Sequence, residues 1–204
     1  MNKRILSLLI CLFISSYTFA QKIFVWCPPE AEVATANNKL SGLDMNIIIK
    51  DIRKITDTSR VECSSTNLVT LVANTITRNY PAAIINVLDT NQYTAPPEKA
   101  KITVRIAISA YHSASGITAS TAIGTTEGDF SWGALPKNKW NSVAGFHVVI
   151  DDYRTETLRT LTRNIANIVS RPNIGGSLTA KKALLEAYKE ANRELLYFIE
   201  STLL

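Results

Sequence analysis

Few side chains in this sequence are of the types and spacings that perform catalysis. The two histidines, His112 and His147, stand far apart, and the chain has no His-x-x-x-His or Cys-x-x-Cys pair, so we expect no metal site. It also has no Gly-x-Ser-x-Gly elbow and no glycine-rich phosphate loop. These patterns favour a protein that is not an enzyme and uses no cofactor. Paired carboxylates of a glycosidase would be recognisable only in three dimensions.

Two segments about a hundred residues apart share one pattern, an aspartate followed two positions later by an arginine. Asp51 and Arg53 end one apolar run, and Asp152 and Arg154 end another. Two interpretations remain open. In the first, each pair decorates a solvated strand end and contributes well under about 1 kcal/mol. In the second, the two strand ends lie side by side and form a polar docking patch for a partner.

The segment from Phe130 to Trp140 holds two of the three tryptophans in a stretch broken by Gly and Pro. On an exposed loop, Trp132 and Trp140 would form a platform for a sugar ring or a protein partner, with Lys137 and Lys139 beside them. The alternative is that the aromatic rings fold back as a plug over the core. The sequence leaves both alternatives open.

Residues 1–20 have the organisation of a secretory signal peptide. Two basic residues are followed by an apolar run too short to span a bilayer, and a small-x-small exit ends at Ala20. Cys11 follows a large apolar residue, unlike a lipid-accepting cysteine. We therefore expect cleavage after Ala20 and a periplasmic or secreted protein without a lipid anchor. No second segment is long and apolar enough to cross a membrane.

Cys27 and Cys63 remain after this cleavage. In an oxidising compartment they would close a loop of roughly 35 residues, a bond worth on the order of 3–4 kcal/mol in the chain-entropy model. Two separate buried thiols are the alternative. The sequence does not supply the Cα separation that would decide between them.

Apolar periodicity predicts the elements that must position these residues. Helices are predicted at 66–80, where Leu68, Val72 and Ile76 recur every four residues, and at 177–202. Strands are predicted at 22–26, 43–52, 82–88, 101–111 and 143–151, and residues 157–170 form either a strand or a partly helical segment.

Two local expectations accompany these elements. Residues 101–111 alternate apolar and polar positions, which predicts a strand with one face in water. In the last helix, Leu184, Tyr188, Ala191, Leu195 and Phe198 form one apolar stripe, and Ser177 or Thr179 is available as the amino-terminal cap. If the sheet does not cover this whole stripe, the helix becomes a homodimer surface.

The order of elements predicts an α+β fold. We expect a mostly antiparallel, curved sheet with both helices on one face and a long C-terminal helix, all within a single domain at residues 21–204. The 204 residues are 46% hydrophobic and 19% charged, which excludes a disordered or low-complexity chain. The net charge is +5, and two of its cations lie within residues 1–20, so a nucleic-acid partner is not expected.

A strand ending in Asp51-x-Arg53, followed by a loop, a helix, a paired strand and a later apolar strand, resembles the small YajG-type and LptE-like envelope lipoproteins of diderm bacteria. The resemblance covers Leu43 to Ser170. It implies a periplasmic, non-enzymatic role near the outer membrane. This chain departs from those families in lacking a suitable acylation cysteine.

These observations lead to one hypothesis and two alternatives. The leading hypothesis is a periplasmic, non-catalytic binding or assembly module that acts with an envelope protein complex or a wall glycan. The first alternative is a hydrolase of wall or extracellular polymers, which a compact pocket uniting Asp or Glu with a polar neighbour would favour. The second is a carrier of an apolar molecule, which requires a cavity between sheet and helices.

Overall fold

The structure is a computed structural model, and it describes residues 23–29, 36–53, 60–99, 101–115 and 139–204. The predicted signal peptide, residues 1–20, lies outside the described residues. Trp132 and Lys137 of the predicted aromatic platform also lie outside them. The signal peptide and the part of the platform formed by Trp132 and Lys137 therefore remain predictions.

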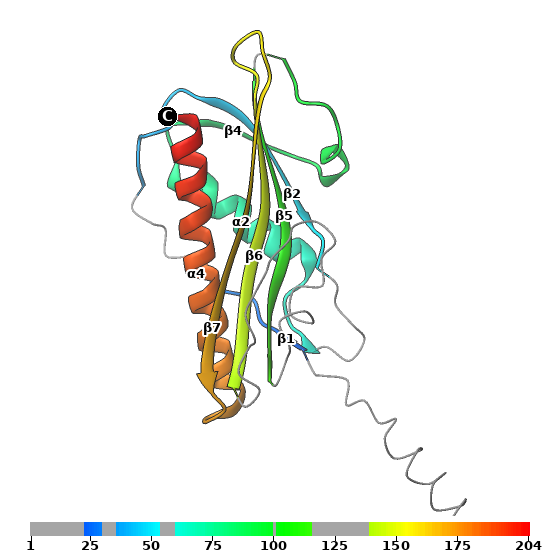
Figure 1. The fold of residues 1–204 in the computed structure, drawn as a ribbon, viewed down its shortest axis with the longest axis vertical. Coiled ribbons are helices and arrows are strands. Elements are labelled where there is room, and N and C mark those ends of the chain that lie inside the picture. Colours follow the sequence, from blue (N-terminus) through cyan, green and yellow to red (C-terminus); the bar gives the residue numbers. More distant parts are fainter. Residues whose placement is uncertain (1–22, 30–35, 54–59, 100, 116–138) are drawn as a thin grey trace, which may run out of the picture.

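Three long strands dominate a seven-stranded sheet (Figure 1). β5 (Ile102–Ser115), β6 (Lys139–Asp152) and β7 (Arg159–Pro172) have 14 residues each. They pair antiparallel, β5 with β6 and β6 with β7. Residues 159–172 are thus wholly strand, which decides between the two alternatives for that segment.

The remaining strands flank the other edge of β5. β2 (Asp44–Asp51) runs parallel to β5, and β4 (Ile84–Leu88) runs parallel to β2. The short β1 (Ile23–Val25) pairs antiparallel with the end of β5 and parallel with β3 (Arg60–Val61).

The α+β class and the long C-terminal helix are confirmed, and the sheet is mixed rather than purely antiparallel. The physical reason lies between β2 and β4, where α2 (Ser65–Asn79) carries the chain back across the sheet. Such a crossover returns the next strand parallel to the first, whereas a short hairpin would return it antiparallel.

One hydrophobic core joins the sheet to both helices. Alternate residues of β2 and β5, such as Ile47 and Val104, point into this core and are fully buried. The predicted stripe of α2 is buried there too. Both helices lie on this side of the sheet, since the hydroxyl of Tyr80, at the end of α2, donates to the carbonyl of Leu196 in α4 (Gly176–Leu203) at 3.1 Å.

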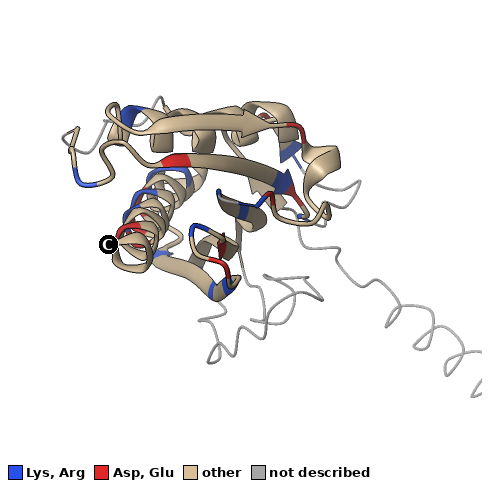
Figure 2. Cartoon of the chain, turned by 90° about the horizontal axis from the view of Figure 1, so that it is seen from above, with Lys and Arg blue, Asp and Glu red and all other residues tan. Residues whose placement is uncertain are grey.

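The apolar stripe of α4 is buried along its whole length, and the helix runs beside β6 and β7 (Figure 1). Every residue of the predicted stripe, from Leu184 to Phe198, is buried. In Figure 2 basic and acidic residues are interspersed along the helix. The stripe is therefore used inside the chain, and homodimerisation through this helix stays a prediction. Among the described residues, no helix is long and apolar enough to span a bilayer.

Two local predictions are wrong. The second face of β5 is not wet, since Thr103 and Ser109 are buried. Part of its cover comes from the segment after β4, whose Ala95 carbonyl accepts from the Arg105 guanidinium at 2.6 Å. The predicted caps of the last helix also fail: the N-cap is Gly175, at φ +87°, and the Thr179 hydroxyl donates instead to the Ile174 carbonyl at 2.6 Å.

Candidate functional site

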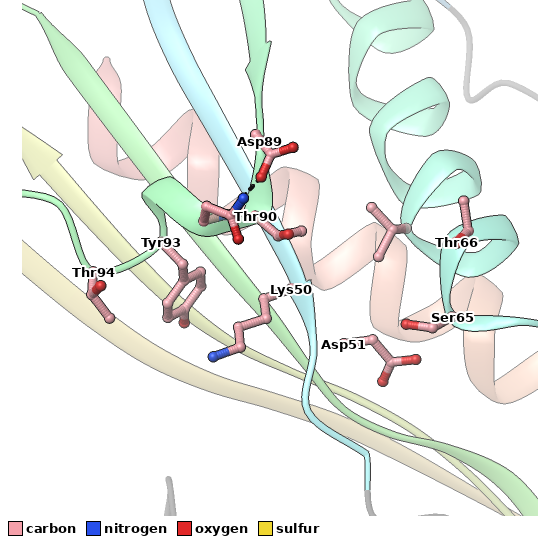
Figure 3. Close-up of a pocket in the computed structure, with 10 residues that line it drawn as sticks. Lys50, Asp51, Ser65, Thr66, Asp89, Thr90, Tyr93 and Thr94 are labelled. Atoms are coloured by element: carbon pink, nitrogen blue, oxygen red, sulfur yellow. Dashed lines mark hydrogen bonds between the residues drawn. The ribbon is translucent and has the colours of Figure 1, made fainter.

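A pocket of about 630 Å³ opens where β2 and β4 end and α2 begins (Figure 3). β4 stops at Leu88, which lies opposite Ile48, so the last residues of β2 extend past it and border the pocket. The carboxyl ends of parallel strands beside a helix amino terminus are a common place for ligands to bind. The residues that line the pocket are Lys50, Asp51, Ser65, Thr66, Val69, Asp89, Thr90, Asn91, Tyr93 and Thr94.

The lining is rich in hydroxyl groups. Five of its side chains carry a hydroxyl, one carries an amide, and Val69 alone is aliphatic. They come from the start of α2 and from the segment after β4, which begins with the 3₁₀ helix η1 (Thr90–Gln92). Figure 3 shows Lys50 between Tyr93 and Asp51, with Ser65 facing the Asp51 carboxylate.

Asp51 and Arg53 form a buried ion pair at this end of β2. The side chains of Asp51 and Arg53 are only 6% and 3% exposed, and Arg53 Nη2 lies 2.6 Å from Asp51 Oδ2. Arg53 Nε donates to Oδ1 at 2.8 Å, and its backbone N–H donates to the same oxygen at 3.1 Å. Nη1 donates to the carbonyl of Tyr111 in β5 at 3.2 Å. The pair therefore ties the end of β2 to β5.

Two opposing influences act on the pKa of Asp51. Burial, the largest single influence, raises it, but the hydrogen bonds and positive charge of Arg53, with a hydrogen bond from Ser65, together lower the pKa below its ordinary value. Asp51 is therefore ionised and already neutralised by its partner.

The other charged groups of the pocket also have partners within it. The Lys50 ammonium lies 5.6 Å from the centre of the Tyr93 ring, a cation–π contact. The Asp89 carboxylate accepts from the backbone N–H of Asn91 at 2.8 Å and so caps η1. The pocket thus offers neutral donors and acceptors more than uncompensated charge.

The second Asp-x-Arg pair repeats the geometry of the first at a different place. Arg154 Nε donates to Asp152 Oδ1 at 2.9 Å, Nη2 lies 2.7 Å from Oδ2, and the backbone N–H of Arg154 caps the carboxylate at 3.1 Å. Nη2 also reaches the Leu203 carbonyl, at 3.3 Å. The side-chain hydrogen bond from Arg154 is the main reason that the pKa of Asp152 is lowered.

The docking patch formed by both pairs is a wrong prediction. In the sheet register Asp51 lies opposite Ile108, whereas Asp152 lies opposite Ile102, six residues away along β5, or about 20 Å. The solvated interpretation is also wrong for the first pair, because Asp51 and Arg53 are buried. The solvated interpretation is partly right for the second pair, in which the Arg154 side chain is 38% exposed.

Trp140 follows the plug interpretation. It is 7% exposed, and its ring meets the edge of Phe24 at a centroid distance of 5.4 Å. Lys139 is exposed at the start of β6. Because Trp132 and Lys137 lie outside the described residues, their part of the platform is a prediction still.

The structure joins Cys27 and Cys63 in a disulfide with a Cα–Cα distance of 4.5 Å. The bond connects the chain just after β1 to the chain just before α2. In the described part of the chain, no three His, Cys, Asp or Glu residues gather as metal ligands would. His147 Nδ1 forms a 2.6 Å hydrogen bond with Asn164 Oδ1.

Sequence reasoning missed most of the pocket. Of its lining residues only Asp51 was a candidate, for its pairing with Arg53. The available signal was the predicted order strand, helix, strand over residues 43–88, which places a helix start beside the ends of two parallel strands. Lys50 and Tyr93 carry no local motif, because they meet only when the segment after β4 folds back over β2.

Comparison with known proteins shows a likeness in structure alone. No protein-family model and no curated protein match the chain. Similar solved structures include the hypothetical protein CT253 of Chlamydia trachomatis, with 10% identity, a TM-score of 0.42 and coverage of 78% of this chain and 96% of that one. Lipoprotein GNA1162 of Neisseria meningitidis has 7% identity, a TM-score of 0.35 and coverage of 74% and 99%.

A third similar structure is the PelC dodecamer of Paraburkholderia phytofirmans, with 10% identity, a TM-score of 0.33 and coverage of 82% of this chain and 94% of that one. Lipoproteins are therefore among the structures this chain is similar to, at low identity. A likeness this distant shows nothing about the activity of this chain.

Proposed function

We propose that this protein is an exported, non-catalytic binding module of the bacterial envelope. Its ligand is the hydroxyl-rich sugar backbone of a wall glycan, held in the pocket at the end of β2. The observation that carries the proposal is the lining of that pocket, which combines hydroxyl and amide groups with a tyrosine ring. Sugars are bound by such donors and acceptors, and an aromatic side chain commonly supports the ring.

The size and charge of the pocket agree with this ligand class. A volume of about 630 Å³ is in the range of small-molecule sites and suits a short oligosaccharide. Asp51, Lys50 and Asp89 already have partners in Arg53, Tyr93 and the Asn91 amide. The hydroxyl and acetamido groups of a glycan backbone are uncharged and can bind beside these side chains without replacing any of the contacts.

The state of Asp51 supports binding rather than hydrolysis. A general acid in a glycosidase needs a carboxyl group whose pKa is raised. Arg53 holds the pKa of Asp51 below its ordinary value instead, and the other carboxylate of the pocket, Asp89, caps η1.

Two features support export. Residues 1–20 have the signal-peptide pattern with cleavage after Ala20. The disulfide between Cys27 and Cys63 is of a kind that persists in oxidising compartments such as the periplasm.

Calorimetric titration of the exported chain with soluble peptidoglycan fragments and with chito-oligosaccharides tests the proposal. Thr90→Val removes one lining hydroxyl without changing side-chain size, and we expect roughly three- to tenfold weaker binding. The matched control is Thr162→Val, an exposed threonine on β7 outside the pocket, which should bind like the wild type. Absence of binding to every glycan, or equal loss in both variants, would reject the proposal.

The same incubations separate the binding module from the hydrolase. Glycan recovered from them should be intact, with no new reducing ends. New reducing ends that disappear in an Asp51→Asn variant would instead establish the hydrolase alternative.

A further inference from the structure

The turn between β7 and α4 lies at one end of the molecule (Figure 1), and two large apolar side chains are exposed on it or just after it. Ile174 is 79% exposed and Leu178 is 62% exposed. Among the described residues, Ile174 is the most exposed large apolar side chain. Isolated apolar residues on a surface are common, so the exposure of Ile174 and Leu178 indicates a binding surface only if the neighbouring residues support one.

The turn has a defined conformation. The backbone N–H of Ile174 donates to the Pro172 carbonyl at 2.8 Å, and the Thr179 hydroxyl donates to the Ile174 carbonyl at 2.6 Å. Gly175 and Gly176 both have positive φ, +87° and +58°, a backbone conformation that other residues rarely adopt. These hydrogen bonds fix the backbone of Ile174, whose side chain is exposed.

Basic side chains surround these two apolar residues. Lys181 and Lys182 are exposed in the second turn of α4, and Lys139, also exposed, pairs in register with Pro172. Arg171 is adjacent and forms a 2.7 Å ion pair with Glu186. We call this surface the β7–α4 tip, defined by Ile174, Leu178, Lys139, Lys181 and Lys182.

The start of α4 adds to the positive potential of the tip. Its first turn contains no acidic residue, and its N-cap, Gly175, supplies no side-chain hydrogen bond. The amino terminus of a helix carries a partial positive charge, and here that charge has the same sign as the three lysines.

We propose that the β7–α4 tip docks on the surface of an anionic phospholipid bilayer. Ile174 and Leu178 insert at the boundary between headgroups and acyl chains, and Lys139, Lys181 and Lys182 contact lipid phosphates. Apolar side chains flanked by cations are the usual composition of such interfacial sites. The charge of the tip is complementary to a negative lipid surface.

Docking by the tip would leave the pocket free. Along the sheet, the end of β2 is level with Ile165 of β7, seven residues from Pro172, or about 23 Å. A docked molecule would hold its pocket above the membrane surface, facing the aqueous compartment. The two sites therefore act independently and fail independently.

Vesicle co-sedimentation tests this inference. Vesicles of phosphatidylglycerol and phosphatidylethanolamine should bind the protein, and phosphatidylcholine vesicles should bind it at least tenfold less. The double variants Ile174→Ser/Leu178→Ser and Lys181→Gln/Lys182→Gln should each reduce the bound fraction roughly tenfold. All proteins are prepared as the exported chain without residues 1–20, so that segment makes no contribution to vesicle binding.

Tyr197→Ser is the matched control, because Tyr197 is 63% exposed on the same helix but outside the tip. It should bind vesicles like the wild type, and thermal unfolding should show that every variant is folded. Equal binding to anionic and neutral vesicles, or tip variants that bind like Tyr197→Ser, would overturn the inference. Loss of glycan binding with vesicle binding intact would reject the proposed function and leave this inference standing.

Discussion

The two Asp-x-Arg pairs show how one local motif has different energetic consequences at different depths. In both, the arginine binds the carboxylate through two side-chain nitrogens and its own backbone N–H, and then reaches a carbonyl of another element. The sequence itself shows the motif, and its two-residue spacing places the aspartate and the arginine on one face of a strand. It could not predict burial, because the cover of each strand end comes from residues distant along the chain.

Burial predicts unequal costs for the same substitution. Arg53→Gln leaves the Asp51 charge buried without its partner, so we expect a loss of about 3–5 kcal/mol in the free energy of unfolding. Arg154→Gln should cost about 1 kcal/mol or less, because its pair is more exposed. Urea denaturation at pH 7 measures both, and equal losses would contradict this account.

Acid should remove the contribution of Arg53 to the free energy of unfolding. Because folding lowers the pKa of Asp51, its contribution is complete above the unfolded value near 3.8 and is lost as the pH falls through the native pKa. The difference between wild type and Arg53→Gln should therefore shrink at the lowest pH at which both still fold.

His112 gives an opposite case, a base that folding keeps neutral. Burial, helped by the nearby Arg53 charge, lowers its pKa from 6.5 to about 4. Between these values the unfolded chain binds more protons than the native one, so stability falls as the pH drops from 6.5 towards 4.

The expected size of this effect is about 2–3 kcal/mol between pH 7 and pH 4.5. A His112→Leu variant should lose that much less stability over this interval than the wild type. A His147→Gln variant keeps His112 and should behave like the wild type. Parallel curves for wild type and His112→Leu in urea titrations would show that His112 is not a buried neutral histidine.

At the scale of elements, periodicity predicted the helices and most strands, because apolar spacing directly reports which face is buried. The directions of the strands were predicted less well than the elements themselves. Strand, helix and strand over residues 43–88 imply a parallel pair, yet the alternation of residues 101–111 suggested an antiparallel sheet with a wet face. That face is buried because residues 89–99 fold over it, with Glu98 accepting from the Asn46 amide at 3.2 Å.

The disulfide is an element-scale constraint, since it connects the end of β1 to the start of α2. The double variant Cys27→Ala/Cys63→Ala should lower the free energy of unfolding by about 3–4 kcal/mol, since the open chain regains loop entropy. Denaturation with and without reductant measures this loss. Reductant should bring the wild type to the level of the variant and leave the variant unchanged; a wild type insensitive to complete reduction would contradict the assignment.

At the scale of the whole molecule, the described sheet and helices form two separate candidate surfaces. The pocket lies where parallel strands end, and the β7–α4 tip lies where the last strand turns into the last helix. Sequence reasoning missed most of the candidate site because its ten lining residues come from three segments that only the fold brings together. The tip was missed because Ile174 and Leu178 belong to no sequence motif, and only the structure shows that they are exposed.

The central claim is that the pocket binds a glycan without cleaving it. The most direct test is a titration of ¹⁵N-labelled exported chain with soluble peptidoglycan fragments, followed by NMR. We predict amide shifts that concentrate on Lys50, Ser65, Thr66, Thr90 and Tyr93 and saturate with one affinity, while the fragments stay intact. An unchanged spectrum, shifts concentrated away from the pocket, or cleaved fragments would contradict it.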